Sequence, residues 1–346
     1  MSPSLRFPEF TGEWVLNEMW NIAPLQRGFD LPSGNVLDGT IPVVYSNGIL
    51  RYHNDYKCKA PAVITGRSGT IGKFTYLDKG YYWPHNTTLW VTDFCHNNPK
   101  FIYYLYQTIN ISQFATGSGV PTLNRNDVHR HRCYLPKSID EQRKIAAFLS
   151  LIDERIAIQD RLIDRLQSLM IGIAQKIAHS NKPNVRISDC LECSSSALQE
   201  SEVNKTGKYP VYGANGIVGY IDKYHTQNEA IYIIKDGSGV GGVSYVTGKC
   251  SSTGTLNILQ AKNGHSLKYL YYLLKVFNFV PYKTGMAIPH IYFKDYGKAK
   301  IFCPAYPEQL EYAKLLSSID GNLRIALDSL KNFNLQKQYL LRHMLI

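Results

Sequence analysis

Two glycine-rich stretches look like phosphate-binding loops, but neither has the required spacing. Gly66 is separated from Gly72-Lys73 by five residues instead of four, and Phe74 stands where a Ser or Thr would hold Mg²⁺. The stretch Gly237–Gly242 lacks the spacing of a dinucleotide-binding fingerprint, so a turn between strands accounts for it better. The glycines therefore do not predict a nucleotide-dependent enzyme.

Cysteine and histidine residues give only a weak signal of metal binding. Cys190 and Cys193 are close in sequence, but no second pair follows at zinc-finger spacing. The other cysteines are dispersed, which favours free structural thiols over a metal site. The run His129–Arg132 suits a metal or phosphate patch, and an exposed strand edge explains it equally well. We therefore expect no bound metal and no cofactor.

Catalytic motifs are incomplete throughout the chain. Asn98-Pro99-Lys100-Phe101 departs at its third position from the Asn-Pro-Pro-Tyr/Phe box of amino-methyltransferases. Neither a serine nucleophile elbow nor an HExxH sequence occurs. The sequence thus predicts a protein that is not an enzyme. A stand-alone nuclease or methyltransferase with unfamiliar motifs is the first alternative.

An internal repeat organises the chain. Phe101–Leu105 recurs as Tyr269–Leu273, and Thr116–Pro121 recurs as Thr284–Pro289. Three further blocks match in the same order: Asn47–Ile49 with Asn215–Ile217, Ile64–Gly72 with Ile234–Gly242, and Glu141–Asp153 with Glu308–Asp320. The pattern indicates one unit of about 170 residues that is present twice.

The first part of each unit mixes strands with a helix. Runs bounded by Gly, Asn and Asp predict strands at Ile41–Tyr45, Thr87–Val91, Ala230–Ile234 and Thr255–Leu259. Apolar residues at helical spacing predict one helix around 99–110 and another around 266–278. We interpret these parts as small α/β domains.

The second part of each unit carries an apolar seam of the coiled-coil type, with steps of four and three residues. The first seam is Leu149, Ile152, Ile156, Gln159, Ile163, Leu166, Met170, Ile173 and Ile177, and the second is Tyr312, Leu316, Ile319, Leu323, Ala326, Leu330, Phe333, Lys337, Leu340 and Met344. Each helix would span about 39 residues, or roughly 58 Å. Because such a helix needs a partner along its length, we expect the two to pair with each other.

Start signals divide the chain into four segments. Ser138 and Glu141 have the spacing of a capping box, and Pro307 suits the first position of a helix. We therefore expect globular parts at 1–139 and 181–305, and long helices at 140–180 and 306–346.

The positive charge is concentrated in the globular parts. The chain has 38 basic and 27 acidic residues, a formal charge of +11. Residues 1–139 carry 13 basic and 9 acidic groups, and residues 181–305 carry 14 and 8, whereas both long helices are nearly neutral. This distribution predicts that the globular parts contact phosphate and that the helices act as a spacer. The alternatives are a generic basic surface and an assembly scaffold that binds proteins or RNA.

The cellular compartment is predicted from what the sequence lacks. No apolar core of signal-peptide length follows Met1, and no run approaches the roughly 18 apolar residues of a membrane span. Seven cysteines in a long chain are typical of a reduced protein. We expect a cytoplasmic protein without a membrane partner.

These features together resemble a known family. The opening Leu5–Trp14, the stretch Thr116–Pro121, then Pro136 and Glu141-Gln142 before a long helix are similar to type I restriction–modification specificity subunits. The resemblance implies an α/β (α+β) fold, in which two pseudo-two-fold-related target recognition domains are separated by two long antiparallel coiled-coil helices.

The resemblance also implies a function. Each recognition domain would bind one half of a bipartite double-stranded DNA site, and the helices would set the gap and dock the methyltransferase (modification) subunits, two in number. A restriction (endonuclease/translocase) subunit would complete the complex, because methylation and cleavage belong to separate subunits. Two reading domains at fixed separation fit a gap of about one helical turn, roughly 34–36 Å.

The second copy departs from the family pattern in two places. Asn184–Asp189 stands where a counterpart of Trp14 is expected, and Met286-Ala287 replaces Ser118-Gly119.

Candidate DNA contacts lie on the paired loops, where a rigid domain can hold polar side chains against groove edges. They are Asn47, Arg67, Ser68, Thr116 and Ser118 in the first copy, and Asn215, Lys235, Asp236, Ser238, Thr284, Met286 and His290 in the second. Lys57, Lys59, Lys73 and Arg125 are expected to contact phosphate instead. The alternative for the Gly-Ser-Gly loops is turn formation alone.

Overall fold

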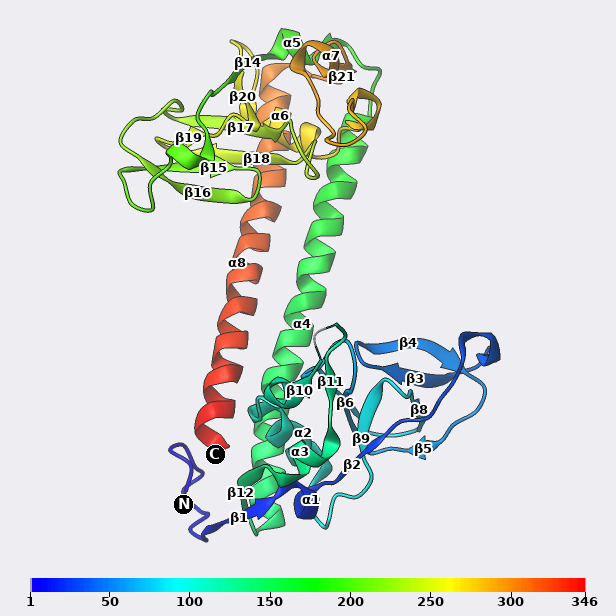
Figure 1. Ribbon diagram of the computed structural model, residues 1–346. Helices are drawn as coiled ribbons and strands as arrows, with labels where there is room; N and C mark the ends of the chain where they lie inside the picture. Colours follow the sequence, from blue (N-terminus) through cyan, green and yellow to red (C-terminus); the bar gives the residue numbers. More distant parts are fainter. Residues whose placement is uncertain (1, 118, 346) are drawn as a thin grey trace. The chain divides into compact units, whose positions relative to one another are not determined.

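The computed structural model describes residues 2–117 and 119–345 and divides into two compact units (Figure 1). The first unit consists of Met1–Gln159 with Ser329–Ile346, and the second of Asp160–Asp328. Each unit thus contains one globular part together with half of each long helix. No helix within the described ranges combines the length and the apolarity needed to cross a membrane.

The globular part of the first unit contains two four-stranded sheets. Its elements are β1 (Trp14–Glu18), α1 (Met19–Ile22), β2 (Leu25–Arg27), η1 (Ser33–Asn35), β3 (Ile41–Tyr45), β4 (Gly48–His53), β5 (Cys58–Lys59), β6 (Ala62–Gly66), β7 (Phe74–Leu77), β8 (Tyr81–Pro84), β9 (Thr88–Val91), α2 (Pro99–Thr108), η2 (Ile111–Phe114), β10 (Ala115–Thr116), β11 (Thr122–Leu123), α3 (Arg125–Arg130) and β12 (Arg132–Pro136). The sheet orders are β2-β9-β6-β7 and β4-β3-β8-β5, while β1 pairs with β12 and β10 pairs with β11.

The second unit repeats this arrangement. Its elements are β13 (Val185–Arg186), α5 (Ile187–Cys190), β14 (Leu191–Ser195), η3 (Glu200–Glu202), β15 (Tyr209–Gly213), β16 (Gly216–Ile221), β17 (Glu229–Ile234), β18 (Val243–Thr247), β19 (Ser251–Ser252), β20 (Leu256–Ala261), α6 (Leu267–Lys275), η4 (Val280–Tyr282), α7 (Phe293–Tyr296) and β21 (Lys300–Ile301). The sheet order β14-β20-β17-β18 matches β2-β9-β6-β7, and β16-β15-β19 matches β4-β3-β8. The predicted strands and short helices are present; Ile41–Tyr45 matches at both ends, and no predicted end differs by more than three residues.

Strand pairing fixes how the two copies align. Ile64 pairs with Trp90 in the first sheet, and Tyr232 pairs with Ile258 in the second. Both residues of the second pair have numbers 168 higher than their counterparts in the first. The match of Ile64–Gly72 with Ile234–Gly242 is therefore wrong by two residues. Ser68 corresponds to Asp236 and not to Ser238, because the backbone ladder sets the register and the similar Gly-Ser-Gly letters do not.

The two long helices are α4 (Ile139–Ala178) and α8 (Tyr306–Met344). In the first unit the beginning of α4 lies beside the end of α8, and in the second unit the end of α4 lies beside the beginning of α8, so the helices are antiparallel. Every residue of the two predicted seams is buried or half-buried, which confirms the seams. The polar seam residue Lys337 forms an ion pair of 2.7 Å with Asp153.

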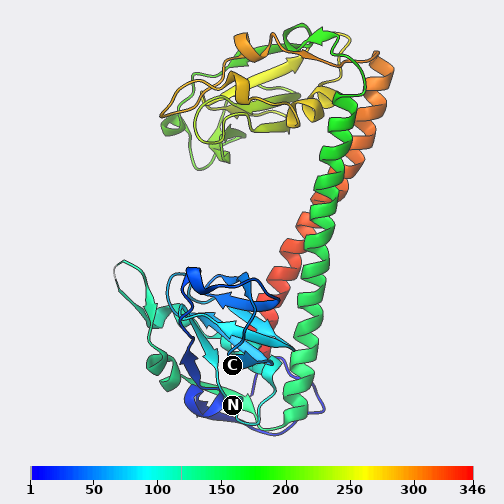
Figure 2. The ribbon, with the colours of Figure 1, turned by 90° about the vertical axis from the view of Figure 1, so that its right-hand side faces the viewer.

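Each globular part is held to the long helices by its own short helix. In the first unit α2 buries Phe101, Tyr104 and Leu105, and the hydroxyl of Tyr104 donates to Asp153 of α4 at 2.7 Å. In the second unit α6 lies against the long helices (Figure 2), and Tyr272 donates to Ser317 of α8 at 3.4 Å. These tyrosines connect α2 to α4 and α6 to α8.

The glutamine of the Glu-Gln pair at the start of each long helix joins that helix to the globular part. Gln142 accepts from the backbone N–H of Asn98 at 2.8 Å and donates to the carbonyl of Pro136 at 3.0 Å. Gln309 repeats both bonds with Ser266 and Pro304, each at 2.8 Å. A buried amide that satisfies two backbone groups explains why the glutamine recurs in both copies.

The predicted helix starts need two corrections. Ser138 accepts from the backbone N–H of Glu141 at 3.3 Å, but the Glu141 carboxylate bonds Arg6 and Trp14 instead of closing a capping box. A buried carboxylate is satisfied better by a guanidinium than by a single backbone N–H. Pro307 is the second helical residue, because α8 begins at Tyr306.

Candidate nucleic-acid interface

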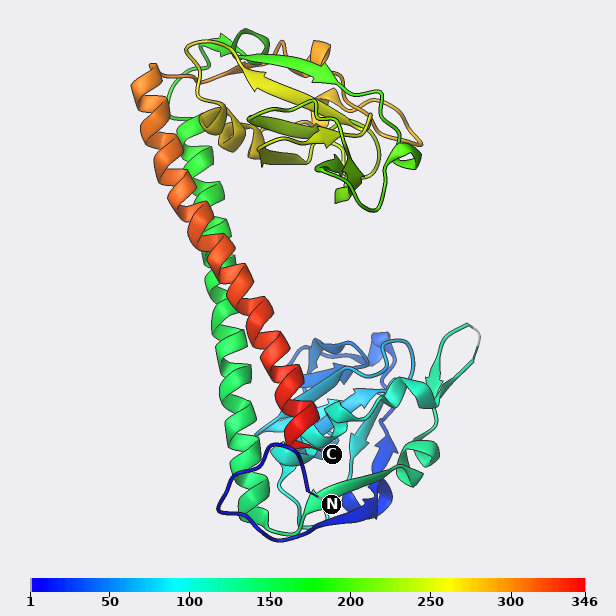
Figure 3. The same cartoon turned by 90° about the vertical axis from the view of Figure 1, so that its left-hand side faces the viewer.

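Two loops of the first unit are joined by backbone hydrogen bonds. The N–H of Arg67 donates to the carbonyl of Thr87, and the carbonyl of Arg67 accepts from Leu123, both at 2.7 Å. The N–H of Gly69 donates to Pro121 at 3.3 Å. The loop after β6 is thus fixed to the β10–β11 hairpin, which projects from the rest of its unit in Figure 3.

The second unit has the same backbone hydrogen bonds between its loops, but the residues at these positions carry different side chains. The N–H of Lys235 donates to Thr255 at 3.0 Å, and its carbonyl accepts from Ile291 at 2.9 Å. Gly237 donates to Pro289 at 3.0 Å. Each of these bonds has its counterpart 168 residues earlier, so Lys235 occupies the position of Arg67. The backbone is retained while the groups that it presents differ.

Both hairpins carry exposed apolar side chains near their tips. Thr284 and His290 exchange backbone hydrogen bonds of 2.8 and 2.9 Å at the base of the second hairpin. Met286 and Ile288 at its tip are exposed, as is Val120 in the first hairpin. Ser118 lies outside the described residues. Exposed side chains on a fixed hairpin can reach a base edge without further folding of the backbone.

Three arginines border an open pocket of about 630 Å³ in the first unit. Arg67 and Arg125 were expected as DNA contacts, and Arg27 on β2 was missed because β2 is distant in sequence. Thr116 also lines this arginine pocket. Arg27 is paired with Asp30 at 3.4 Å on an exposed surface. A cluster of guanidinium groups suits phosphate oxygens and the acceptor edge of guanine.

The β3–β4 turn lies beside the arginine-bearing loop. The ammonium group of Lys73 donates to the carbonyl of Asn47 at 2.7 Å, so two predicted residues come together here. Gly48 follows with a φ of 118°, which a side chain would strain. Asn215 occupies the equivalent turn before Gly216, but the counterpart of Lys73 is Gly242, because Phe74 and Val243 begin equivalent strands. The second unit therefore lacks this cation.

The remaining predicted residues lie on other segments. Lys57 directly precedes β5, and Lys59 is its second residue. The ammonium group of Lys57 lies 4.7 Å from the ring centroid of Trp83. Ser238 follows Gly237 in the turn between β17 and β18. A lysine over an aromatic face keeps its charge accessible, which still suits a phosphate contact.

His129–Arg132 is not an exposed strand edge. His129 is buried at the end of α3, and its Nε2 accepts from the backbone N–H of Leu25 at 2.8 Å. Burial lowers the pKa of His129, and the nearby charge of Arg125 lowers it further. The helix periodicity was missed because α3 has only six residues. A neutral His129 joins α3 to β2, next to the arginine pocket.

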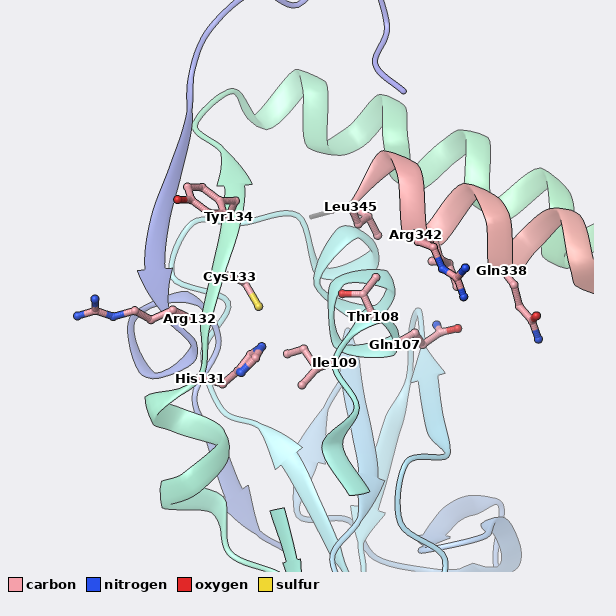
Figure 4. A pocket seen from close by; sticks show the side chains of 11 residues that line it. Gln107, Thr108, Ile109, His131, Arg132, Cys133, Tyr134, Gln338, Arg342 and Leu345 are labelled. Atoms are coloured by element: carbon pink, nitrogen blue, oxygen red, sulfur yellow. The ribbon is translucent and has the colours of Figure 1, made fainter. Parts of the chain in front are cut away.

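A second cavity of about 600 Å³ shares no residue with the arginine pocket. Figure 4 shows the end of α2, β12 and the last turns of α8 around it, with Thr108, Cys133 and Arg342 among its lining residues. A similar hollow in the second unit includes Val276 and Ile301, the counterparts of Thr108 and Cys133. Its presence in both units indicates a consequence of the repeat architecture.

Comparison with known proteins agrees with the duplicated fold. The type I restriction modification DNA specificity domain matches twice, at residues 19–168 and 180–332. A type I specificity subunit of Mycoplasma pneumoniae is 25% identical over 260 residues, covering 67% of this chain and 69% of the relative. The EcoprrI specificity subunit of Escherichia coli is 25% identical over 112 residues, covering 32% of this chain and 28% of that protein.

Solved structures give the same answer for the fold. The crystal structure of a type I restriction–modification S subunit from M. genitalium superimposes with a TM-score of 0.73 at 18% identity, covering 100% of this chain and 99% of the other. The two family matches cover most of the chain. This chain belongs to the family of type I restriction–modification DNA specificity subunits.

Proposed function

We propose that each globular part, 1–139 and 181–305, is a target recognition domain that reads one half of a bipartite double-stranded DNA site. The observation that carries this proposal is the repeated loop frame, in which identical backbone bonds present Arg67 in one unit and Lys235 in the other. A retained frame with exchanged side chains is what two readers of different sequences require.

Charge and side-chain chemistry support the same assignment. The formal surplus of basic residues lies in the globular parts, where phosphate contact would supply sequence-independent affinity. The arginine pocket of the first unit and the Asp236 and His290 loops of the second supply different donors and acceptors. The two units would therefore prefer different bases.

We further propose that the outer faces of the long helices dock modification subunits. Leu151, Ile158, Leu162 and Leu169 follow one another along α4 at steps of seven, four and seven residues, and all are exposed. An apolar stripe outside the helix seam favours a protein partner over water. Two modification subunits, one for each repeat, and a restriction subunit would complete a cytoplasmic complex, in which this chain contributes recognition and no catalysis.

The test is sequencing of methylated sites in cells that contain the cognate modification subunit. Arg67→Ala should relax one half-site and leave the other intact, and Asp236→Ala should do the reverse, each with about 1–3 kcal/mol less discrimination. Lys57→Ala is the control, because loss of a phosphate contact should weaken binding without changing the recognised sequence. Changes in both half-sites from Arg67→Ala alone would contradict the two-reader proposal.

The absence of catalysis is tested separately. The purified chain should transfer no methyl group from S-adenosylmethionine and cut no DNA with Mg²⁺. Methyl transfer by a contaminant-free preparation would instead support the alternative of a stand-alone enzyme.

A further inference from the structure

Two cysteines and a histidine converge inside the second unit. Cys190 ends α5, His265 immediately precedes the cap of α6, and Cys303 follows β21. Their ligand atoms all lie within 4.8 Å of one another, and the Sγ of Cys303 is 3.6 Å from the Nδ1 of His265. Both cysteines are buried, and the histidine is half-buried.

The first unit provides an internal comparison for this cluster. Asn98 caps α2 as Ser266 caps α6, so His265 corresponds to Asn97. By the same offset Cys190 corresponds to Ile22 and Cys303 to Leu135. In the first unit Ile22 and Leu135 are buried in the apolar core, and Asn97 donates to the carbonyl of Ile22 at 3.1 Å.

All three positions therefore differ between the copies in the same chemical direction. Two aliphatic side chains and an amide in one unit are replaced by two thiols and an imidazole in the other. Packing alone does not require this joint change, because the aliphatic set already fills the equivalent space of the first unit. Thiolate and imidazole are the donors that Zn²⁺ prefers in proteins.

We propose that Cys190, His265 and Cys303 bind a thiophilic divalent cation of the Zn²⁺ class. A tetrahedral site with a Zn–S distance of about 2.3 Å and a Zn–N distance of about 2.05 Å places sulfur and nitrogen about 3.6 Å apart. The separation of Cys303 and His265 agrees with this value. Water can complete the coordination, because three protein ligands leave one position open.

Neighbouring backbone bonds hold the ligands in place. The side chain of Asn184 brackets Cys303, donating to its carbonyl at 2.7 Å and accepting from its N–H at 2.8 Å. The carbonyl of Cys190 accepts from the N–H of Lys262 at 2.9 Å. Such outer contacts orient metal ligands. The cation would tie together the first and last segments of the second globular part, directly before α8.

The test measures metal in the purified full-length chain under reducing conditions. We expect about one equivalent of zinc by mass spectrometry, removed by a strong chelator and restored by added zinc. Titration with Co²⁺ should give a thiolate-to-cobalt absorption band. Failure of the wild-type chain to bind either metal, or recovery of a Cys190–Cys303 disulfide in its place, would overturn the proposal.

The variants follow the internal comparison. Cys190→Ile, His265→Asn and Cys303→Leu together introduce the residues of the first unit, and should abolish the cobalt band while retaining apolar packing. His265→Asn alone should weaken binding at least tenfold. Cys193→Ser is the matched control and should retain the full metal content. A cobalt band that persists in the triple variant would exclude this site, whatever the DNA specificity of the chain.

Discussion

Single residues of the same type have different surroundings in the two repeats. Glu141 is buried and accepts from Arg6 at 2.7 Å and from the indole of Trp14 at 3.1 Å. Glu308, its counterpart, is exposed and accepts only from Tyr312 at 2.8 Å among the bonds described. The hydrogen bond to Glu141 raises the pKa of Arg6. Glu141 thus anchors the N-terminal segment to α4.

Replacing Glu141 should reveal this anchor. Glu141→Gln would leave Arg6 without its carboxylate partner, and we expect unfolding to become easier by about 2 kcal/mol. The measurement is chemical denaturation of the full chain, followed by tryptophan fluorescence. Glu308→Gln is the matched control and should change the free energy of unfolding by less than about 0.5 kcal/mol. Equal effects of the two substitutions would contradict the anchor.

His129 should make the first unit sensitive to acid. Its folded-state pKa is lowered, first by burial and then by Arg125, so folding favours the neutral ring. A group with a depressed pKa stabilises the fold above its unfolded pKa, about 6.5, and loses this contribution as the pH falls through the folded value. Burial also lowers the pKa values of His85 and His131 in the same unit.

A substitution can isolate the contribution of His129 to the loss of stability at low pH. His129→Gln retains an acceptor for the N–H of Leu25 but removes the titrating ring. The melting temperature of this variant should fall less steeply than that of wild type between about pH 7 and pH 5. Substitution of the exposed His225 by Gln should leave the wild-type slope. An unchanged slope in His129→Gln would show that the buried ring does not contribute.

Among the elements, α4 and α8 depend on their apolar seams. Ile156 is half-buried against the core of the first unit, whereas Ile158 on the same helix is 56% exposed. Ile156→Asp would place a charge in the seam without a partner, and should cost about 3 kcal/mol or more. Ile158→Asp is the control and should lie within about 0.5 kcal/mol of wild type. Thermal unfolding compares them, and equal melting temperatures would disprove the seam.

The same elements show how far sequence alone predicts this fold. Both long helices could be predicted because the four-three spacing continues over many turns, and strong periodicity survives changes of individual residues. The register of the loop after β6 was predicted wrongly, because Ser68-Gly69 and Ser238-Gly239 match in letters, whereas the strand ladder aligns Ser68 with Asp236. Short α3 offered too few turns for any periodicity.

The candidate site was predicted in part for the same reason. Arg67 and Thr116 lie in stretches marked by the repeat, and they line one pocket together with Arg125 of α3. Arg27 belongs to a strand that sequence reasoning did not identify, so its contribution was missed. The convergence of Cys190, His265 and Cys303 depends on three distant segments, and no local spacing indicates it.

At the scale of the whole molecule, each long helix contributes one half to each of the two units. The core of the first unit contains Ile145 and Leu149 of α4 together with Leu340 and Met344 of α8. The N–H of Leu5 also donates to the carbonyl of His343 at 2.9 Å, which brings the two chain ends together. The globular part of the first unit therefore folds against the beginning of α4 and the end of α8.

The helices should set the gap without affecting which bases are read. The ion pair of Asp153 with Lys337 gives the antiparallel register, so 160–166 and 324–330 are facing heptads. Deleting both keeps the seam in phase and removes about 10 Å at about 1.5 Å per residue. Methylated-site sequencing with the cognate modification subunit should then reveal the same half-sites at a shorter spacing. The control is deletion of 160–166 alone, which breaks the register and should abolish methylation. An unchanged gap after the paired deletion, or altered half-sites, would show that the helices do not act as the spacer.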